Sequence, residues 1–359
     1  MSRPTKALIS RSALRHNAGV AKALAPHSQV MAVIKANAYG HGATDVATAL
    51  HEHVDAFAVA CVEEAIELRS CGIQLPILLL EGVFSDDEIE SAAELRLWLT
   101  IEKNAQLHAL LNSDAAEAIE CWVKVDTGMH RLGFSPEQAA AAWEQLNQSH
   151  KATNDVVLFT HFADAETIGG EPTAHQLALF NNVNVKASRS ACNSAGLLTL
   201  AQAHFDWVRP GYMIYGNSPL EEPHPNTTSL RPAMTLCSAI SSLRTLVAGQ
   251  TVGYGGTWRA QRKTTIATVP IGYGDGYPRS APAGTPVLVN GQRAPLAGRV
   301  SMDMITLDVT DLADIALGDE VILWGPELPV DEIAIHAGTN GYELTTRMPA
   351  RTPRIFVDD

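Results

Sequence analysis

The sequence contains few cysteines, and they form no pattern typical of metal binding or of disulfide cross-linking. There are five, and no two stand in a C-x-x-C arrangement. An odd number of scattered cysteines is typical of reduced thiols, and it gives no support to a disulfide framework or a zinc site. Several lie in apolar runs, where a thiol fills core space. The residues are Cys61, Cys71, Cys121, Cys192 and Cys237.

The chain also lacks an excess of positive charge. It has 26 lysines and arginines against 39 aspartates and glutamates, which gives a formal net charge of -13. Bulk electrostatic attraction to nucleic acid or to an anionic membrane surface is therefore not expected. Any phosphate group that this protein binds must be held by a local set of donors.

Long apolar runs are absent as well. No segment is long enough to span a bilayer. The first six residues lead directly into the short apolar run Ala7-Leu8-Ile9, with no apolar region typical of a signal peptide. We therefore expect a cytoplasmic protein.

The chain of 359 residues is too long for one simple core, so we expect two domains. In its first two thirds, short apolar runs alternate with longer segments of helical character, which is typical of a (β/α)8 barrel of the TIM type. A doubly wound open sheet is the alternative, and the number of repeats favours the barrel. The expected strands are residues 30–34, 56–60, 77–80, 97–101, 121–125, 156–160, 188–192 and 208–215.

Two of the intervening helices have clear boundaries. Residues 12–24 are expected to form a helix whose N-cap is Ser10 or Ser12. Residues 62–70 place acidic side chains opposite apolar ones, and Gly72 is expected to end that helix.

The last third has a different composition. Residues 217–232 are rich in proline and read as a linker, and beyond them the helical pattern nearly disappears. Asn290-Gly291 follows an apolar run and is a strong hairpin signal. We therefore expect a barrel domain at residues 1–230 and a mostly β domain at residues 231–359. In the second domain the expected strands are 264–271, 286–289, 304–309 and 320–323, with one helix at 330–336.

Polar residues follow the expected barrel strands at their carboxyl ends, which is where barrel enzymes carry their active sites. Each of these residues alone is more often structural than functional. Their placement at five strand ends predicts a common site at the mouth of the barrel. They are Lys35, Lys124, Arg131, His161, Asn193 and Ser194, and the eighth expected strand begins with Val208-Arg209-Pro210-Gly211.

Lys35 is the most informative of these residues. A lysine is almost never fully buried without a partner, and in a pocket it can lose its proton and attack a carbonyl group. Ser194 and Gly211 lie near the last two strands, where barrels often hold phosphate. An amine and a phosphate seat on one barrel suggest pyridoxal phosphate bound to Lys35 as a Schiff base. The alternative is that Lys35 lies on an ordinary surface loop.

Residues 271–277 of the second domain form a second candidate motif. Glycines flank Tyr273 on both sides and free it to project into a site. The alternative is a glycine-rich turn with ordinary aromatic packing.

Taken together, these segments resemble the alanine racemases, pyridoxal-phosphate enzymes built from a barrel and a β domain. The resemblance covers essentially the whole chain in order, and its most specific segments are the first one and GYGDGYPR. The matching segments are AVIKANAYGHG, KVDTGMHRLGF, THFADA, CNSAG, HFDWVRPG, VGYGGTW, PIGYGDGYPR, GRVSMDM and GYEL.

The resemblance implies a reaction that interconverts L-alanine and D-alanine on a pyridoxal-phosphate aldimine, supplying D-alanine for cell-wall peptidoglycan. Lys35 would carry the cofactor and act as one base, and Tyr273 of a partner subunit would act on the opposite face. Two opposed bases suit an inversion, because the proton leaves from one side and returns on the other. The enzyme would be a homodimer with active sites shared between subunits.

The resemblance also implies roles for the other residues. Arg209 would hydrogen-bond the pyridine nitrogen, Arg131 and the backbone of the partner's Met302 would hold the substrate carboxylate, and Lys124 would brace Arg131. In some family members the lysine at this position is carbamylated. The expected cofactor-binding residues are Lys35, Tyr39, His161, Asn193, Ser194, Arg209, Gly211 and Tyr342.

Three other functions remain open at this stage. A broad-specificity amino-acid racemase or serine racemase of the same fold would keep the cofactor and change the substrate. A non-catalytic pyridoxal-phosphate carrier would need no second domain. A metal-dependent barrel hydrolase would rest only on His161 with Asp164. None of these functions gives a role to His41, whose chemistry the sequence does not indicate.

Overall fold

The computed structural model describes residues 3–358, and the chain divides into two compact units. The barrel unit contains Leu14–Ala38 and Ala43–Leu230. The β unit contains Met1–Ala13, Tyr39–Gly42 and Arg231–Asp359. The sequence interpretation assigned all of residues 1–230 to one domain. The first residues group instead with the β unit, because their strand pairs with two strands, Met234–Ala239 and Arg354–Val357.

Eight parallel strands close into a barrel, which confirms the predicted fold and excludes the open sheet. Each begins within three residues of its predicted start. The last expected strand is wrong beyond Val208: Pro210 has no N–H to continue a ladder, and a short 3-10 helix, η2 (Tyr212–Tyr215), follows instead. The strands are β2 (Gln29–Val33), β3 (Ala56–Val59), β4 (Ile77–Leu79), β5 (Leu97–Ile101), β6 (Cys121–Lys124), β7 (Val157–Phe159), β8 (Arg189–Ser190) and β9 (Trp207–Val208).

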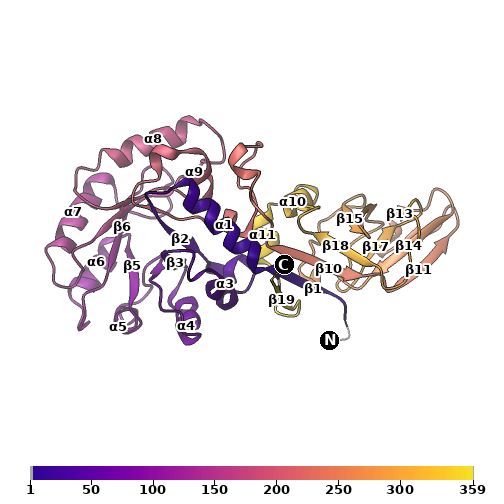
Figure 1. Ribbon diagram of the computed structural model, residues 1–359, viewed down its shortest axis with the longest axis horizontal. Helices are drawn as coiled ribbons and strands as arrows, with labels where there is room; N and C mark the ends of the chain where they lie inside the picture. Colours follow the sequence, from indigo (N-terminus) through magenta and orange to yellow (C-terminus); the bar gives the residue numbers. More distant parts are fainter. Residues whose placement is uncertain (1–2, 359) are drawn as a thin grey trace. The chain divides into compact units, whose positions relative to one another are not determined.

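Helices lie outside this ring of strands (Figure 1). Residues 62–70 form a helix as predicted, and Gly72 follows it with φ +84°. The hydroxyl of Ser10 accepts from the N–H of Ala13, so Ser10 rather than Ser12 caps the first helix. The helices are α1 (Arg11–Leu24), α3 (Ala43–Leu50), α4 (Val62–Ser70), α5 (Glu88–Glu94), α6 (Asn104–Leu111), α7 (Pro136–Asn147), α8 (Glu171–Asn181), α9 (Ser194–Thr199) and the 3-10 helices η1 (Ala201–Ala203) and η3 (Pro225–Thr227).

Three tryptophans fill the barrel near the amino ends of its strands. The ring centre of Trp98 lies 6.1 Å from that of Trp122 and 5.5 Å from that of Trp207. Bulky aromatic rings at this end make it packed core. A site can therefore lie only at the other end of the barrel, where the carboxyl ends of the strands meet.

The β unit contains three antiparallel or mixed sheets. Its largest has the order β16-β15-β18-β10-β1-β19, and β11-β14-β17 and β12-β13 form the others. Asn290 and Gly291 both have positive φ and join β15 to β16, as the hairpin signal predicted. The strands are β1 (Lys6–Ser10), β10 (Met234–Ala239), β11 (Ser242–Leu246), β12 (Thr251–Val252), β13 (Trp258–Arg259), β14 (Thr264–Val269), β15 (Pro286–Val289), β16 (Gln292–Pro295), β17 (Ile305–Asp308), β18 (Glu320–Trp324) and β19 (Arg354–Val357).

The β unit has one helix more than the sequence predicted. The expected helix is α10 (Val330–Ala337), which ends at Gly338 with φ +71°. The additional helix is α11 (Gly341–Thr346), where the side chain of Asn340 accepts from the N–H of Glu343. An Asn followed three residues later by Glu is a helix-start signal that could have located it. Two short 3-10 helices, η4 (Tyr254–Gly256) and η5 (Tyr273–Asp275), complete the unit.

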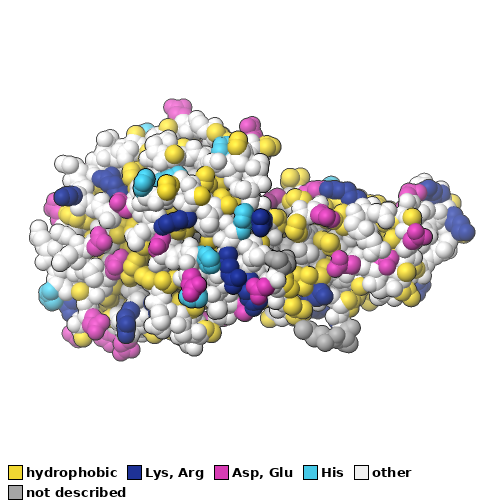
Figure 2. All heavy atoms as spheres, in the orientation of Figure 1, with side chains coloured by type: hydrophobic (Ala, Val, Ile, Leu, Met, Phe, Trp, Pro, Cys, Tyr) yellow, Lys and Arg dark blue, Asp and Glu magenta, His cyan; other side chains and the backbone are white. Residues whose placement is uncertain are grey.

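The surface agrees with the charge balance of the sequence. Figure 2 shows acidic and basic side chains interspersed over both units on the face that it presents. Among residues 3–358, no helix combines the length and the apolarity that crossing a membrane requires.

Candidate active site

Lys35 lies just beyond β2 and opens a strained turn, α2 (Lys35–Tyr39). Four consecutive residues there, Ala36 to Tyr39, have φ between 51° and 54°, so the turn is left-handed. For residues with a Cβ this conformation costs roughly 1–2 kcal/mol each. Such strain persists only where the surroundings fix it, and it concentrates at functional sites. No sequence pattern indicates this turn, since alanine, like other residues with a Cβ, disfavours the left-handed conformation.

Specific contacts hold the turn in place. The N–H of Ala36 donates to Glu64 Oε1 at 2.6 Å, and the N–H of Ala43 donates to Asn37 Oδ1 at 2.8 Å. These bonds fix the backbone on both sides of the turn. Lys35 itself remains partly exposed at the carboxyl end of its strand, where the sequence placed it.

The barrel places four cationic side chains around His161. Burial and the nearby charges of Arg209, Lys124, Arg131 and Lys35, in that order, hold the pKa of His161 well below its usual range. The imidazole is therefore neutral at neutral pH. The convergence predicted from the strand ends is thus present for these five residues, and it concentrates positive charge at one end of an acidic protein's barrel. Such a mouth attracts anionic groups.

Lys124 is a buried member of this cluster. It is 6% exposed, and its Nζ lies 4.7 Å from the ring centre of Phe159. Burial and the charges of Arg209 and Arg131 lower the pKa of Lys124 to about 7. Lys124 and Arg131 would repel each other as like charges, and loss of the proton of Lys124 relieves part of that repulsion.

The pKa of Lys124 predicts a pH-dependent stability. Its ordinary pKa is 10.5. Between about pH 7 and that value the folded state binds fewer protons than the unfolded state, so this group makes the free energy of unfolding rise with pH. We expect Lys124→Met to raise the Tm of cofactor-free protein most near about pH 6.5, with a smaller gain near about pH 9.5. Differential scanning calorimetry in CO2-free buffer measures this, and a gain that is constant with pH would contradict it.

Arg209 is buried against the barrel wall. Its Nη1 donates to Ser190 Oγ, its Nη2 donates to Thr160 O at 2.5 Å, and the guanidinium lies 5.1 Å from the ring centre of Phe159. Burial lowers the pKa of Arg209 to about 10, so it stays protonated at neutral pH. It is both a fixed cation of the site and a brace between strands.

Loss of Arg209 should destabilise the barrel. Arg209→Met would leave the buried carbonyl of Thr160 and the hydroxyl of Ser190 without this donor, at a cost of about 1–3 kcal/mol. Urea unfolding of cofactor-free protein measures this cost. Arg244→Met, at an exposed position of β11, is the control and should change the free energy of unfolding by less than about 0.5 kcal/mol. Equal effects of the two variants would contradict this account.

Ser194, Asn193 and Gly211 come together beside β8 and β9. Ser194 Oγ accepts from the N–H of Gly211 at 2.9 Å and from that of Met213 at 3.3 Å. Asn193 caps α9 by accepting from the N–H of Gly196 at 3.0 Å. With its oxygen engaged by two donors, the hydroxyl proton of Ser194 can point to an external acceptor such as a phosphate oxygen.

Tyr39 and Tyr342 form a pair within the β unit. Their ring centres lie 6.0 Å apart. Burial raises the pKa of Tyr39 to about 12, so its hydroxyl remains a donor. A Cβ on Gly40 would lie 1.8 Å from the carbonyl oxygen of Thr345, so only glycine lets this loop approach α11. His41, fully buried, has its Nδ1 3.0 Å from the carbonyl oxygen of Tyr39 and therefore braces the loop.

Tyr273 and Met302 lie on adjacent loops of the β unit. The N–H of Tyr273 donates to Ser301 O at 3.0 Å, and the N–H of Gly274 donates to Met302 O at 2.9 Å. A Cβ on Gly272 would lie 2.2 Å from Ser301 O, so the glycine is required by this close approach. The side chains of Tyr273 and Met302 are 39% and 52% exposed.

Asp275 is a residue of this region that the sequence analysis missed. It is fully buried and accepts from Arg3 and Arg351. No local sequence signal could have found it, because Arg3 lies 272 positions away.

In the described part of the chain, no three His, Cys, Asp or Glu side chains are grouped so that they could hold a metal ion.

Comparisons with known proteins match both units. A family model described as alanine racemase, N-terminal domain, matches residues 9–219, and one described as alanine racemase, C-terminal domain, matches residues 233–356. The chain is 49% identical over 356 residues to "Alanine racemase, biosynthetic" of Pseudomonas aeruginosa, covering 99% of both chains. It is 47% identical over 358 residues to "Alanine racemase" of Chromohalobacter salexigens, covering 99% of this chain and 98% of that one.

Solved structures match equally well. The crystal structure of biosynthetic alanine racemase from Pseudomonas aeruginosa superposes with a TM-score of 0.95 at 48% identity, and 99% of each chain is covered. The structure of alanine racemase from Acinetobacter baumannii gives a TM-score of 0.93 at 39% identity, with 99% of this chain and 100% of that chain covered.

Proposed function

This chain belongs to the alanine racemase family of isomerases, and from that premise we propose that it interconverts L-alanine and D-alanine with pyridoxal phosphate as cofactor. The observation that carries the proposal is the cluster of Lys35, Lys124, Arg131 and Arg209 around a neutral His161. A mouth of this charge suits an anionic cofactor and a substrate carboxylate, and a lysine at its edge suits an aldehyde.

The donors present fit pyridoxal phosphate. Ser194, Tyr39 and Tyr342 would hold the phosphate group through their hydroxyl groups, and Gly211, which has no side chain, would let the backbone approach it closely. Because Arg209 stays protonated, it would donate to the pyridine nitrogen. His161 and Asn193 would line the same seat. When bound, the cofactor supplies an electron sink that acidifies the α-proton of the amino acid.

The proton transfers fall to Lys35 and Tyr273. Lys35 would remove or return the proton on one face of the substrate α-carbon, and Tyr273 would do so on the opposite face. Inversion requires both, since a single base returns the proton to the side from which it came.

We propose that Tyr273 comes from a second copy of the chain, so that the enzyme is a homodimer. The β unit exposes several large apolar side chains, and those of Tyr273 and Met302 lie on adjacent loops, which supports an interface there. These side chains are Tyr254, Tyr273, Met302 and Met304, at 71%, 39%, 52% and 52% exposure.

The substrate carboxylate would be held by Arg131, whose planar fork of donors suits it, and by the backbone of the partner's Met302. Lys124 would brace Arg131. With a pKa of about 7 its amine is substantially neutral at neutral pH, so it can attack CO2, lose a proton and become a carbamate anion. A carbamate would replace a like charge beside Arg131 with an opposite one.

A role in supplying D-alanine for peptidoglycan is part of the proposal, and the word biosynthetic in the names of two relatives supports it. Incubating purified, cofactor-loaded protein with L-alanine and with D-alanine, followed by chiral chromatography, tests the reaction. We expect both to approach an equimolar mixture. No D-alanine from L-alanine would refute the proposal, and equal turnover of L-serine would favour the broad-specificity alternative.

A further inference from the structure

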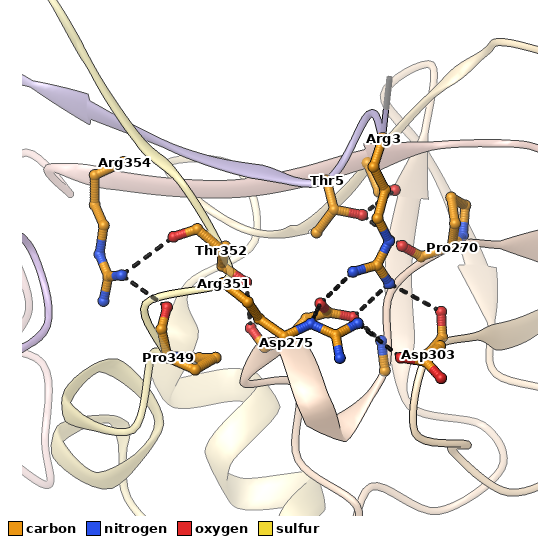
Figure 3. Close-up of polar contacts among 11 residues, drawn as sticks. Arg3, Thr5, Pro270, Asp275, Asp303, Pro349, Arg351, Thr352 and Arg354 are labelled. Carbon is orange, nitrogen blue, oxygen red and sulfur yellow. Dashed lines mark hydrogen bonds and ion pairs between the residues drawn. The ribbon is translucent and has the colours of Figure 1, made fainter. Parts of the chain in front are cut away.

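Asp275 is a fully buried carboxylate at the end of η5, two residues after Tyr273. Four donors converge on it, as Figure 3 shows for the arginines. Arg3 donates to both carboxylate oxygens, at 2.5 and 2.7 Å. Arg351 Nε lies 2.8 Å from Oδ1, and the N–H of Gly272 donates to Oδ2 at 2.9 Å. The carboxylate therefore fixes both ends of the turn that carries Tyr273.

The same arginines also reach the loop of Met302. Arg3 Nη2 donates to Asp303 O at 3.1 Å, and Arg351 Nη2 donates to Asp303 Oδ1 at 2.7 Å (Figure 3). We refer to Arg3, Asp275, Asp303 and Arg351 as the Asp275 clamp. It ties together the two loops that the backbone bonds from Tyr273 and Gly274 already join.

Stability alone is a weak reason for such a cluster. Replacing a buried ion pair with apolar side chains of similar volume is often neutral or stabilising, whereas hydrogen-bonded charges fix one geometry. Within a single chain the side chains of Tyr273 and Met302 are substantially exposed, so this chain's own packing does little to fix them. Their positions in the chain that meets its partner are therefore set by the backbone of these two loops.

We propose that Asp275 is a positioning residue, which, with Arg3 and Arg351, holds Tyr273 and the backbone of Met302 in the geometry that the reaction requires. The inference rests on the proposed function, in which Tyr273 is a base. A misplacement of about 1 Å can cost roughly 100-fold in rate, so a rigid support for an exposed base has a large effect.

Asp275→Asn tests this inference in two ways. It keeps the shape of the side chain but removes the charge, and it turns an amide donor toward the arginines. Without cofactor, hydrogen exchange at the amides of Tyr273 and Gly274 should become at least about 10-fold faster. With cofactor, racemisation should fall by about 10- to 100-fold. In D2O, α-proton exchange with retention should rise relative to inversion, because the Lys35 side of the reaction is untouched.

Glu332→Gln is the matched control, since it breaks the Arg293–Glu332 pair elsewhere in the β unit. It should leave hydrogen exchange at the amides of Tyr273 and Gly274 unchanged. It should also leave the ratio of α-proton exchange to inversion unchanged. If Asp275→Asn does not fold, Arg3→Gln removes one partner of the clamp and should change both readouts in the same direction.

The inference would be overturned if Asp275→Asn left hydrogen exchange at the amides of Tyr273 and Gly274 unchanged. It would also be overturned if the variant lost α-proton exchange and inversion of alanine to the same extent. An inactive wild-type protein would refute the proposed function instead, and hydrogen exchange in cofactor-free protein would still decide whether the clamp orders the Tyr273 turn.

Discussion

Replacing Lys35 with alanine should reduce the interconversion of L-alanine and D-alanine by at least about 1,000-fold, because the change removes both the amine that we propose binds the cofactor and one of the two proposed bases. Lys35 stands on a locked left-handed turn at the mouth of the barrel, so no neighbouring lysine has an equivalent position. Borohydride reduction of the loaded wild-type protein should attach the cofactor to the peptide that contains Lys35, as detected by mass spectrometry.

Lys22→Ala is the control for this prediction. Lys22 lies on α1, is 47% exposed and pairs with Asp55, so its loss should change the rate by less than about twofold. Full turnover by Lys35→Ala, or attachment of the cofactor to Lys124, would show that the assignment of Lys35 is wrong.

Tyr273→Phe should reduce racemisation by about 100- to 10,000-fold, since it removes the proposed acid–base hydroxyl and keeps the ring. L- and D-alanine have equal free energies, so kcat/KM must remain equal in the two directions and cannot distinguish the bases. Exchange of the α-proton with solvent can distinguish the two bases. In D2O, one enantiomer should still exchange its α-proton with retention, because Lys35 removes and returns it on one face. Proton NMR combined with chiral chromatography measures both quantities.

Tyr254→Phe provides the comparison for this variant, because it removes the hydroxyl of another exposed tyrosine of the same unit and keeps the apolar ring assigned to the interface. It should retain normal racemisation. If Tyr273→Phe exchanges neither enantiomer, or both equally, then Tyr273 is not a separate base on its own face.

The barrel was predictable because its signals are local. Each strand is a short apolar run, and closure of eight such strands brings their carboxyl ends together. Lys124, His161 and Arg209 are therefore close enough for their charges to interact, as expected from three strand ends. The hairpin at Asn290-Gly291 was equally local, since two residues with positive φ determine it.

Features that depend on distant partners were not predictable. The strand β1 belongs to a sheet whose other members begin at Met234, and nothing within residues 6–10 indicates this. The left-handed turn at Lys35 is fixed partly by Glu64, and the Asp275 clamp joins residues 272 positions apart. In each case a backbone conformation or a buried charge is stabilised by a residue that local sequence patterns cannot connect to it.

The central claim is that each active site combines Lys35 of one chain with Tyr273 of another. Mixed dimers of Lys35→Ala and Tyr273→Phe, formed by coexpression with two different affinity tags, test it most directly. If sites are shared, each mixed dimer has one of its two sites with both bases intact, so mixed dimers isolated through both tags should have about half of wild-type activity, and the unfractionated random pool about a quarter. If the mixed dimers form but remain as inactive as either parent while the wild type is active, both bases come from the same chain and the account is contradicted.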